Sequence, residues 1–435
     1  MRVFLCAGEA SGDAYGAALV EEIRRLSSPL GAVSDDQPLS SLFEDSLDAV
    51  ELLMSLEDEL ETEIADDEFG RLSTVGDLRR YVTARGGTLP EGPAIRFQGV
   101  GGPKLKSAGV RLVRDSSGWG VISIFQVLRR LPTLVSGFRA AKNALSVPPE
   151  REGIPGLFIP IDFGYMNIRL ARHAKKLGWK VLYFVPPGSW RRDRQGPDLP
   201  HVTDAIVTPF EWSAEILKSM GANAHWFGHP IKQLLERVGG RGARSEAVIA
   251  VLPGSREHEI ELNLPLISET FRKLSKDLRA EFALAPSVDS KSFKTKWETL
   301  SGRTGDAFTA GQTSQVLNRA KAAIVCSGTA TLEAALCRCP MVVVYKLSKG
   351  MELEAKLLRI KRPKYIALPN ILMDAPVVPE LVQQDATPQN VATQLEKLLK
   401  DSSLQLREFE KLDELLGPSD AITQAAILAC EMLKS

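Results

Sequence analysis

Residues 2–26, RVFLCAGEASGDAYGAALVEEIRRL, contain a strand, a glycine-rich turn and a helix in direct succession. The run RVFLCA (2–7) is short and apolar, which indicates a buried strand. The turn GEASGD (8–13) follows, and from residue 14 to residue 26 the apolar side chains recur at intervals of three and four, which indicates an amphipathic helix. This succession is typical of the opening unit of a doubly wound parallel sheet.

The same alternation of apolar strand and helix returns along the chain. Strand-like runs lie at 95–100, 156–161, 180–185, 205–207, 247–252, 322–326 and 341–345. We therefore predict an α/β protein of two Rossmann-like domains that face a cleft. The first domain spans 1–229 and is interrupted by an insert at 30–90, a small all-helical acidic segment after the first helix. The second spans 230–415, and a last helix, 416–435, is expected to pack back on the first domain.

Composition limits the class of protein. Of 435 residues, 44% are hydrophobic and 25% charged, which excludes a disordered or collagen-like chain. No apolar run approaches the roughly 18 residues that span a bilayer. The five scattered cysteines lack metal-ligand spacing, so we expect a cytoplasmic protein without a metal.

Charge is unevenly distributed, although the net charge is zero. Fourteen acidic residues and no Lys or Arg lie between 35 and 68, which leaves 40 acidic against 54 basic residues elsewhere. A basic body favours anionic partners such as phosphates, nucleotides or a membrane surface.

Ligands of parallel sheets bind at the carboxyl ends of the strands, and three loops there are candidate binding sites. The first is the turn that carries Glu9, which is otherwise a plain strand-to-helix connection. The second is PGSR (253–256), whose Arg256 can bridge a diphosphate beside a helix start. The alternative is a surface ion pair of Arg256 with Glu257 or Glu259.

The third loop opens a helix at Ser327, Gly328 and Thr329. The free N–H groups of a helix start bind phosphate, and Glu333, about one turn later, is placed to accept hydrogen bonds from ribose hydroxyls. A bare helix cap is the alternative.

Asp162 ends an apolar strand, where a carboxylate facing a cleft is well placed to act as a general base. The alternative is a cap for the helix that follows. His229 precedes a proline in the linker, and we expect its side chain either to contact substrate or to cap a helix.

Residues 121–145 are a candidate membrane-binding segment. Apolar residues recur at helical spacing, and the segment contains Arg and Lys but no Asp or Glu. Pro132 is expected to kink or restart the helix. The predicted lipid contacts are Ile124, Val127, Leu128 and Leu131. A core-facing helix with a solvated basic face is the alternative.

Several motifs together resemble the lipid-A-disaccharide synthase family, inverting glycosyltransferases of the GT-B fold. They are AGEASGD (7–13), GVGGPKLKSAG (99–109), FGHP (227–230), LPGSREHEIE (252–261), SGTATLEAAL (327–336), CPMVVVYKLS (339–348) and ALPNILMD (367–374). The resemblance implies an inverting hexosyltransferase that joins UDP-2,3-diacylglucosamine to 2,3-diacylglucosamine 1-phosphate in lipid A biosynthesis. It assigns catalytic roles to Glu9 and Asp162 and binding of the UDP-sugar to Arg256 and Asn370, and analogy with nucleotide sites of the fold adds Glu333.

The resemblance also implies a location and partners: the cytoplasmic face of the inner membrane, as a peripheral protein, with no nucleic acid. A homodimer is left open. One block departs from the family pattern, because IDAPDFN is here IDFGYMN (161–167), without the proline and the second Asp. This block favours one alternative, a non-catalytic or altered-specificity UDP-sugar-binding protein that carries an acyl-carrier domain. A same-fold nucleotide-sugar epimerase is the second alternative.

The acidic insert resembles acyl carrier protein. The likeness rests on EDSLDAVELLMSLEDEL (44–60), IADDE (64–68), TVGDL (74–78) and YV (81–82). It implies 4′-phosphopantetheine on Ser46, with a phosphopantetheinyl transferase and enzymes that use acyl carriers as partners. A decorative acidic helical insert is the alternative.

Overall fold

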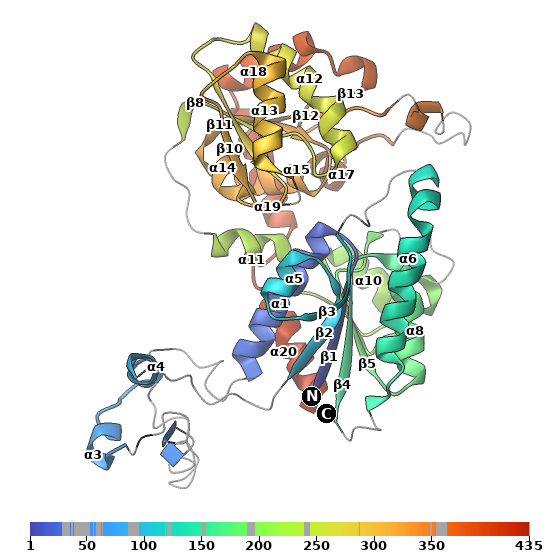
Figure 1. Cartoon of the computed structure of the whole chain (residues 1–435), viewed down its shortest axis with the longest axis vertical. Coiled ribbons are helices and arrows are strands. Elements are labelled where there is room, and N and C mark those ends of the chain that lie inside the picture. Colours follow the sequence, from blue (N-terminus) through green and yellow to red (C-terminus); the bar gives the residue numbers. More distant parts are fainter. Residues whose placement is uncertain are drawn as a thin grey trace. The chain divides into compact units, whose positions relative to one another are not determined.

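The computed structural model describes most of the chain, which folds into two α/β units with a small helical insert in the first (Figure 1). The described residues are 1–27, 35, 38, 53, 54, 56, 57, 62, 64–85, 95–117, 119, 124–149, 154–188, 196–238, 244–286, 288–348, 350–353 and 363–434. Unit 1 comprises 1–116, 133–226 and 421–435, and unit 2 comprises 117–132 and 227–420.

Unit 1 is built on a seven-stranded sheet in which every strand pair is parallel. In sheet order its strands are β3 (Arg111–Asp115), β2 (Arg96–Gly101), β1 (Arg2–Ala7), β4 (Gly156–Ile161), β5 (Lys180–Phe184), β6 (Ala205–Thr208) and β7 (Ala224–Trp226). The order reverses beside β1, between β2 and β4, and such a switch point is where open parallel sheets bind ligands.

Helices cover both faces of this first sheet. Figure 1 shows α1 (Ala10–Ser27), α5 (Pro103–Ser107) and α20 (Ala421–Lys434) on one side, and α6 (Ile124–Leu145) and α8 (Gly164–Lys176) on the other. Outside the insert, the unit also contains α9 (Leu199–Val202) and α10 (Glu211–Ser219). The final helix α20 packs against α1, and the hydroxyl of Thr423 bonds the Glu22 carboxylate at 2.9 Å.

Unit 2 repeats the plan with a six-stranded parallel sheet. In sheet order its strands are β10 (Ala307–Ala310), β9 (Arg279–Leu284), β8 (Ser245–Leu252), β11 (Ala320–Cys326), β12 (Met341–Tyr345) and β13 (Glu380–Val382). Its helices are α11 (Pro230–Arg237), α12 (Glu257–Lys273), α13 (Ser290–Ser301), α14 (Thr313–Arg319), α15 (Thr329–Leu336), α17 (Leu368–Met373), α18 (Pro388–Lys400) and α19 (Ser403–Leu415).

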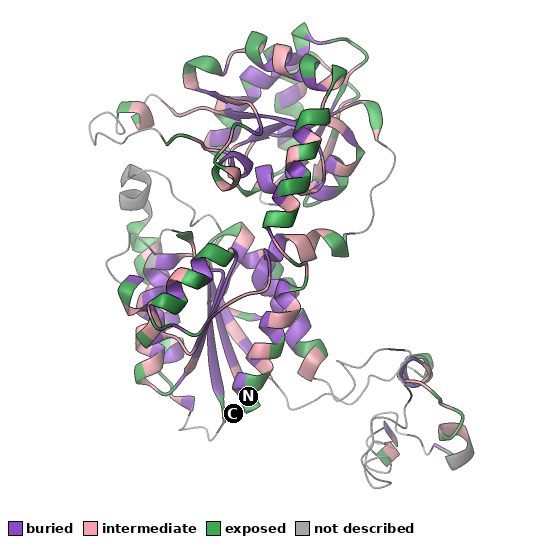
Figure 2. Ribbon diagram, turned by 180° about the vertical axis from the view of Figure 1, so that it is seen from behind, coloured by how far each residue is buried: buried purple, intermediate pink, exposed green. Residues whose placement is uncertain are grey.

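Burial follows the sequence pattern closely. The strands that read as continuous apolar runs are buried on both faces, as in Figure 2, where both sheets are purple and the outer helix faces are green. The two parallel-sheet domains confirm the predicted fold class. The expected restart of a helix at Pro132 does not occur, because α6 continues as one helix through this residue.

The insert has a hydrophobic cluster of its own. Its described helices are α3 (Asp66–Phe69) and α4 (Val75–Ala84), and a reciprocal pair of hydrogen bonds between Thr74 and Asp77 caps α4. The buried members of the cluster are Leu56, Ile64, Leu78 and Val82. The helical insert is therefore a packed unit, in agreement with the prediction.

Candidate active site

Asp162 lies directly after β4, at the carboxyl edge of the first sheet. Its backbone has a φ of 52°, and Phe163 follows with a φ of 48°. Val185, directly after the neighbouring strand β5, has a φ of 54°. Residues other than glycine occupy this left-handed region rarely, and the cost is greatest for β-branched side chains. Among the described residues of unit 1, the left-handed conformation of non-glycine residues is thus confined to the ends of two adjacent central strands.

Contacts from both sides hold this backbone. The amide nitrogen Nδ2 of Asn167 lies 2.8 Å from the carbonyl oxygen of Asp162, and the phenol of Tyr183 donates to the same oxygen at 3.0 Å. The ring of Phe163 lies over Gly8, where an added Cβ would sit 2.3 Å from the ring. Gly8 is therefore the residue that the turn after β1 needs.

The electrostatic environment of Asp162 suits a proton acceptor. Burial is the main cause that raises the pKa of the Asp162 carboxyl to about 6, and the negative charge of Glu9 is the second. Hydrogen bonds from the Phe163 N–H and from Ser11 act in the opposite direction, because they favour the ionised form. Glu9 itself is exposed in the turn after β1. The structure thus brings together Glu9 and Asp162, which lie 153 positions apart in the sequence.

Asp13 is a residue of this edge that the sequence analysis did not single out. Its buried carboxylate accepts backbone N–H bonds from Gly102 at 2.7 Å, Lys104 at 2.9 Å and Leu105 at 3.1 Å. These bonds cap α5, whose own N-cap residue is a glycine without a capping side chain. The side chain therefore fastens the turn that carries Glu9 to the loop after β2.

In unit 2, Arg256 is the N-cap residue of α12, in the loop after β8. Its guanidinium bonds the Glu259 carboxylate at 2.7 Å, which is one of the two ion pairs expected as alternatives to phosphate binding. Glu259 is buried, and its second oxygen accepts the N–H groups of Ser255 and Arg256. Gly254, with a φ of 123°, leaves room for this carboxylate, since a Cβ there would lie 2.6 Å from the Glu259 Cβ.

The second loop of unit 2 follows β11. Ser327 donates to the Ile366 carbonyl at 2.8 Å, and Gly328 is the N-cap residue of α15, without a capping side chain of its own. Thr329 is the first residue of this helix, and Glu333, one turn in, is half-buried. The loop thus presents a helix start to the carboxyl edge of the sheet, as predicted for an anion site, with the adjoining 366–368 segment held against it.

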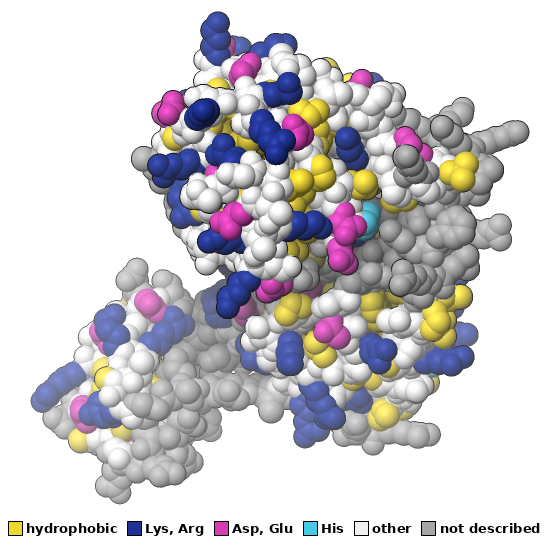
Figure 3. All heavy atoms as spheres, turned by 45° about the horizontal axis from the view of Figure 1, so that its top comes forward, with side chains coloured by type: hydrophobic (Ala, Val, Ile, Leu, Met, Phe, Trp, Pro, Cys, Tyr) yellow, Lys and Arg dark blue, Asp and Glu magenta, His cyan; other side chains and the backbone are white. Residues whose placement is uncertain are grey.

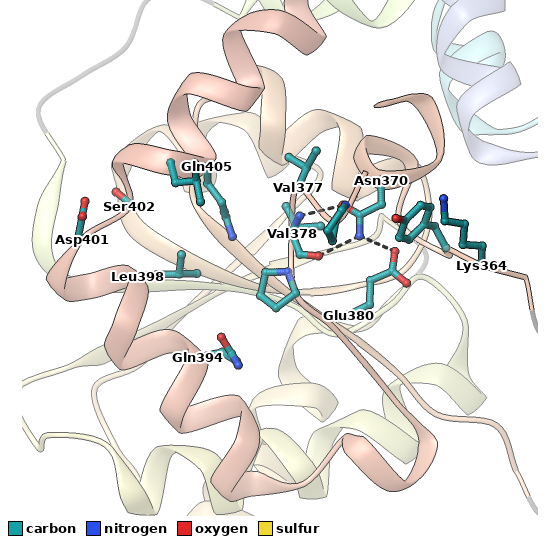
Figure 4. Close-up of a pocket in the computed structure, with 14 residues that line it drawn as sticks. Lys364, Asn370, Val377, Val378, Glu380, Gln394, Leu398, Asp401, Ser402 and Gln405 are labelled. Atoms are coloured by element: carbon teal, nitrogen blue, oxygen red, sulfur yellow. Dashed lines mark hydrogen bonds between the residues drawn. The ribbon is translucent and has the colours of Figure 1, made fainter. Parts of the chain in front are cut away.

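Asn370, on α17, is 1% exposed, and its side-chain nitrogen and oxygen both form hydrogen bonds within the protein. Nδ2 donates to the Val378 carbonyl at 2.9 Å and to Glu380 at 2.8 Å, and Oδ1 accepts from the Val378 N–H at 2.8 Å. Glu380 also accepts the N–H groups of Ile366 at 3.0 Å and Ala367 at 2.9 Å. In Figure 4 the bonds of Asn370 to Val378 and Glu380 lie along the wall of a cavity of about 500 Å³. The side chain of Asn370 therefore shapes the backbone beside Ser327.

Histidine and cysteine play structural parts here. His229 caps α11 through Nδ1, 3.2 Å from the Ile231 N–H, and burial lowers its pKa to about 3. All five cysteines are free. Among the described residues no three His, Cys, Asp or Glu side chains are arranged to hold a metal ion.

Figure 3 shows Lys and Arg side chains dispersed among acidic ones on the face of the molecule that it presents.

Two predicted sites lie wholly or partly outside the described side chains. Ser46 is not among the described residues, and the side chains of Ile124, Val127 and Leu128 are likewise not described. Leu131, on α6, is 46% exposed, which agrees better with a surface role than with a core position. Of the helices that the structure describes, none has the length and apolar character required to cross a bilayer.

Comparison with known proteins identifies the family. The model of the lipid-A-disaccharide synthetase family matches residues 85–425. The chain belongs to this family. Curated lipid-A-disaccharide synthases from Anaeromyxobacter dehalogenans strain 2CP-1 and Neisseria meningitidis serogroup A are each 32% identical. The first match covers 74% of this chain and 85% of the relative, and the second covers 70% and 80%.

The lipid-A-disaccharide synthase family is one of inverting hexosyltransferases, so the family membership confirms the predicted class of enzyme. A second family model, of the phosphopantetheine attachment site, matches residues 17–82 and confirms the carrier-like character of the insert.

Solved structures support the fold alone. A putative UDP-N-acetylglucosamine 2-epimerase from Listeria monocytogenes is 12% identical with a TM-score of 0.51, over 99% of this chain and 95% of that one. The UDP-GlcNAc 2-epimerase from Neisseria meningitidis, solved with bound UDP-GlcNAc, is 10% identical with the same TM-score, over the whole of both chains. Both likenesses agree with the predicted GT-B fold.

Proposed function

We propose that this protein joins UDP-2,3-diacylglucosamine to 2,3-diacylglucosamine 1-phosphate and releases UDP, as a step of lipid A biosynthesis. The observation that carries the proposal is the half-buried Asp162 at the carboxyl edge of the first sheet, in a chain of this family. A carboxyl with a pKa of about 6 is ionised near neutral pH and is still basic enough to take a proton.

In the proposed mechanism Asp162 takes the proton of the acceptor hydroxyl. The hydroxyl oxygen forms a bond to the anomeric carbon of the donor, the bond from that carbon to the diphosphate breaks, and the configuration inverts. The charge of Glu9 favours the protonated form of Asp162 and so assists the transfer. Glu9 and Asp162 are thus the proposed catalytic pair.

The departing UDP carries negative charge that unit 2 is proposed to stabilise. The guanidinium of Arg256 and the helix start at Ser327, Gly328 and Thr329 supply positive charge and N–H donors to the diphosphate. Glu333 is proposed to contact the ribose, and Asn370 to act through the backbone that it holds. This scheme assigns the diphosphate to protein groups and not to a metal ion.

The test is an assay of the purified full chain with both acylated sugars in mixed micelles. Formation of one UDP per disaccharide, identified by mass spectrometry, supports the proposal. A UDP-sugar that changes to its 2-epimer without an acceptor supports the epimerase, and binding of UDP without any product supports a non-catalytic protein. Either of these results overturns the proposal.

We also propose that the protein binds the cytoplasmic face of the inner membrane as a peripheral protein through α6. Exposed Leu131 and Val135 support this, together with the basic residues of the helix. Acylated substrates stay in the bilayer, because each buried methylene contributes about 0.8 kcal/mol, so the enzyme must reach them there. Replacing Leu131 and Val135 with Ser should weaken sedimentation with anionic liposomes and leave the melting temperature unchanged. A loss of stability instead would assign the helix to the core.

For the insert we propose 4′-phosphopantetheine on Ser46, added by a phosphopantetheinyl transferase, with enzymes that use acyl carriers as further partners. The family match over 17–82 and the clustered core at Leu56, Ile64, Leu78 and Val82 support it. The test is intact mass after co-expression with a phosphopantetheinyl transferase. A mass increase in the wild-type chain that is absent from Ser46→Ala is expected, and an unmodified wild-type chain contradicts the proposal.

A further inference from the structure

We propose that Tyr183 and Asn167 are positioning residues, which hold the backbone of Asp162 in its left-handed conformation and thereby fix the place of the catalytic carboxylate. The inference rests on the proposed role of Asp162 as the base. It assigns a function to two side chains of the first domain, that of Tyr183 on β5 and that of Asn167 on α8.

The strained backbone is the first part of the argument. Asp162 and Phe163 have φ values of 52° and 48°, and neither is a glycine. Two successive left-handed residues persist only where the surrounding structure holds them, and such strain is concentrated at functional sites. No proline ring restricts this turn, because Gly164 follows Phe163. The restraint must therefore come from tertiary contacts.

Asn167 supplies one of these contacts. Its Nδ2 lies 2.8 Å from the carbonyl oxygen of Asp162, 3.1 Å from that of Ile161 and 3.1 Å from that of Cys6. A flipped amide would turn its oxygen toward three carbonyl oxygens, so the hydrogen-bond network decides the orientation. The amide thus connects the ends of β1 and β4 with the first residue after β4.

This connection has a cost that points to function. Asn167 is 0% exposed, and its Oδ1 is a buried oxygen without a hydrogen-bond partner among the described residues. An unpaired buried acceptor lowers stability, and stability alone does not favour an asparagine at this position. The amide is better explained by what its nitrogen holds.

Tyr183 supplies the second contact, from the neighbouring strand. An amide nitrogen has two hydrogens, and that of Asn167 is shared among three carbonyls. The phenol of Tyr183 gives the Asp162 carbonyl a donor of its own, at 3.0 Å, and the ring is fully buried, so the oxygen has a fixed position. The N–H of Asp162 also bonds the carbonyl of Phe184, at 3.3 Å, which adds a backbone tie to the same strand.

Loss of the phenol oxygen should release the carbonyl and let residues 162 and 163 relax toward right-handed conformations. The carboxylate then moves out of its half-buried place and becomes better solvated. Better solvation lowers the pKa of a carboxyl toward its ordinary value, because the charged form is no longer penalised. A side chain that only fills the core would not change this titration.

The experiment compares Tyr183→Phe with Tyr81→Phe in the full chain. The control also deletes a buried phenol oxygen, but within the cluster of the insert. The pKa of the Asp162 carboxyl is followed by carbon NMR, with Asp162→Asn to assign the signal, and turnover and UDP affinity are measured in parallel. We expect Tyr183→Phe to lower that pKa, to move the acid limb of the turnover profile to lower pH and to reduce turnover about tenfold, with UDP affinity unchanged.

An unchanged pKa and an unchanged pH profile in Tyr183→Phe would overturn the inference, whatever its melting temperature. Asn167→Ala gives a second measurement of the same kind, since it removes the other donor and leaves the phenol in place. Failure of the proposed function looks different, because Asp162→Asn would then retain turnover, or the wild-type chain would have none. The NMR titration still decides the positioning role in that case.

Discussion

The central loops at the carboxyl edges of the two sheets differ in which residues adopt the left-handed backbone conformation. After β4 and β5, the left-handed backbone conformations fall on Asp162, Phe163 and Val185, which are strained by them. After β8 and β11 they fall on Gly254 and Gly328, which adopt them without steric cost. The first edge has strained backbone around a half-buried carboxyl. Among the described residues of the second edge only Gln383, after the outer strand β13, has such strain, and the two central loops adopt their conformations on glycine beside carboxylates that already accept hydrogen bonds.

This difference matches the chemistry proposed for each edge. A general base works best when its pKa lies near the working pH, and partial burial raises the pKa of Asp162 in that direction. A diphosphate site needs donors that are held before the ligand arrives, and Glu259 and Glu380 hold the loops that supply them. The strained backbone thus lies beside Asp162, the group that changes its charge in the proposed mechanism. The loops that adopt their conformations without strain lie beside groups that keep their charge.

The largest expected effect comes from Asp162→Asn. The variant keeps the shape of the side chain and loses its basicity, so turnover should fall at least about 100-fold while UDP affinity is unchanged. Turnover and calorimetric titration with UDP measure the two edges separately. Asp198→Asn, a carboxylate of the first domain that pairs with Arg172 at the surface, is the control. Near-normal turnover of Asp162→Asn would remove Asp162 from the mechanism.

Arg256→Ala tests the proposed diphosphate site at the carboxyl edge of the second sheet. It should weaken UDP binding by about 1.5–3 kcal/mol, or roughly 10- to 150-fold, the range for a hydrogen bond to a charged group. Arg272→Ala is the matched control, because Arg272 lies on the same helix and pairs with Glu269 at the same spacing as Arg256 with Glu259. Equal UDP affinity of the two variants would place the diphosphate elsewhere.

The strain and burial at the first edge should also appear in stability. The pKa of Asp162 is about 6 in the folded protein against an ordinary 3.8. Between these values the Asp162 carboxyl binds more protons in the folded state than in the unfolded state. The contribution of Asp162 to stability therefore falls as the pH rises from about 4 to 6 and is constant above that. Asp162→Asn should therefore be more stable than the wild type by about 3 kcal/mol at pH 8, with no difference below about pH 4.

Urea unfolding of both proteins at pH 4, 6 and 8 measures this difference. Equal stability changes at all three pH values would show that the mutation acts through packing and not through the charge. A gain in stability joined to a loss of turnover would identify Asp162 as a group held against its own preference, as expected for an active site.

The sequence could predict the first edge better than the second. Asp162 ends an apolar run, and a carboxylate in that place is visible in the sequence. The left-handed backbone is not, because it depends on Asn167 and Tyr183, which reach Asp162 from a helix and a neighbouring strand. The sequence analysis took Asn370 as a substrate ligand from its motif alone. Its burial against Val378 and Glu380 became visible only once α17 and β13 were placed together.

The smallest effect is expected from Glu380→Ala, and it tests how the second edge is held. The carboxylate of Glu380 accepts N–H bonds from Ile366 and Ala367 and a bond from Asn370, and the same segment receives the hydroxyl of Ser327 through the Ile366 carbonyl. Without it the segment loses its anchor, but Ser327 and the helix start remain.

We therefore expect the donor KM to rise about fivefold, which is about 1 kcal/mol, with the acceptor KM unchanged. Glu281→Ala, which deletes a buried carboxylate paired with Arg319 elsewhere in the same domain, controls for a general loss of stability. If Asn370 acts through Glu380, the double variant Asn370→Ala/Glu380→Ala should raise the donor KM no further than the stronger single variant, because the two residues share one network. Additive effects would mean instead that Asn370 contacts the donor by itself, and the second edge would then resemble the first in offering a side chain directly to its substrate.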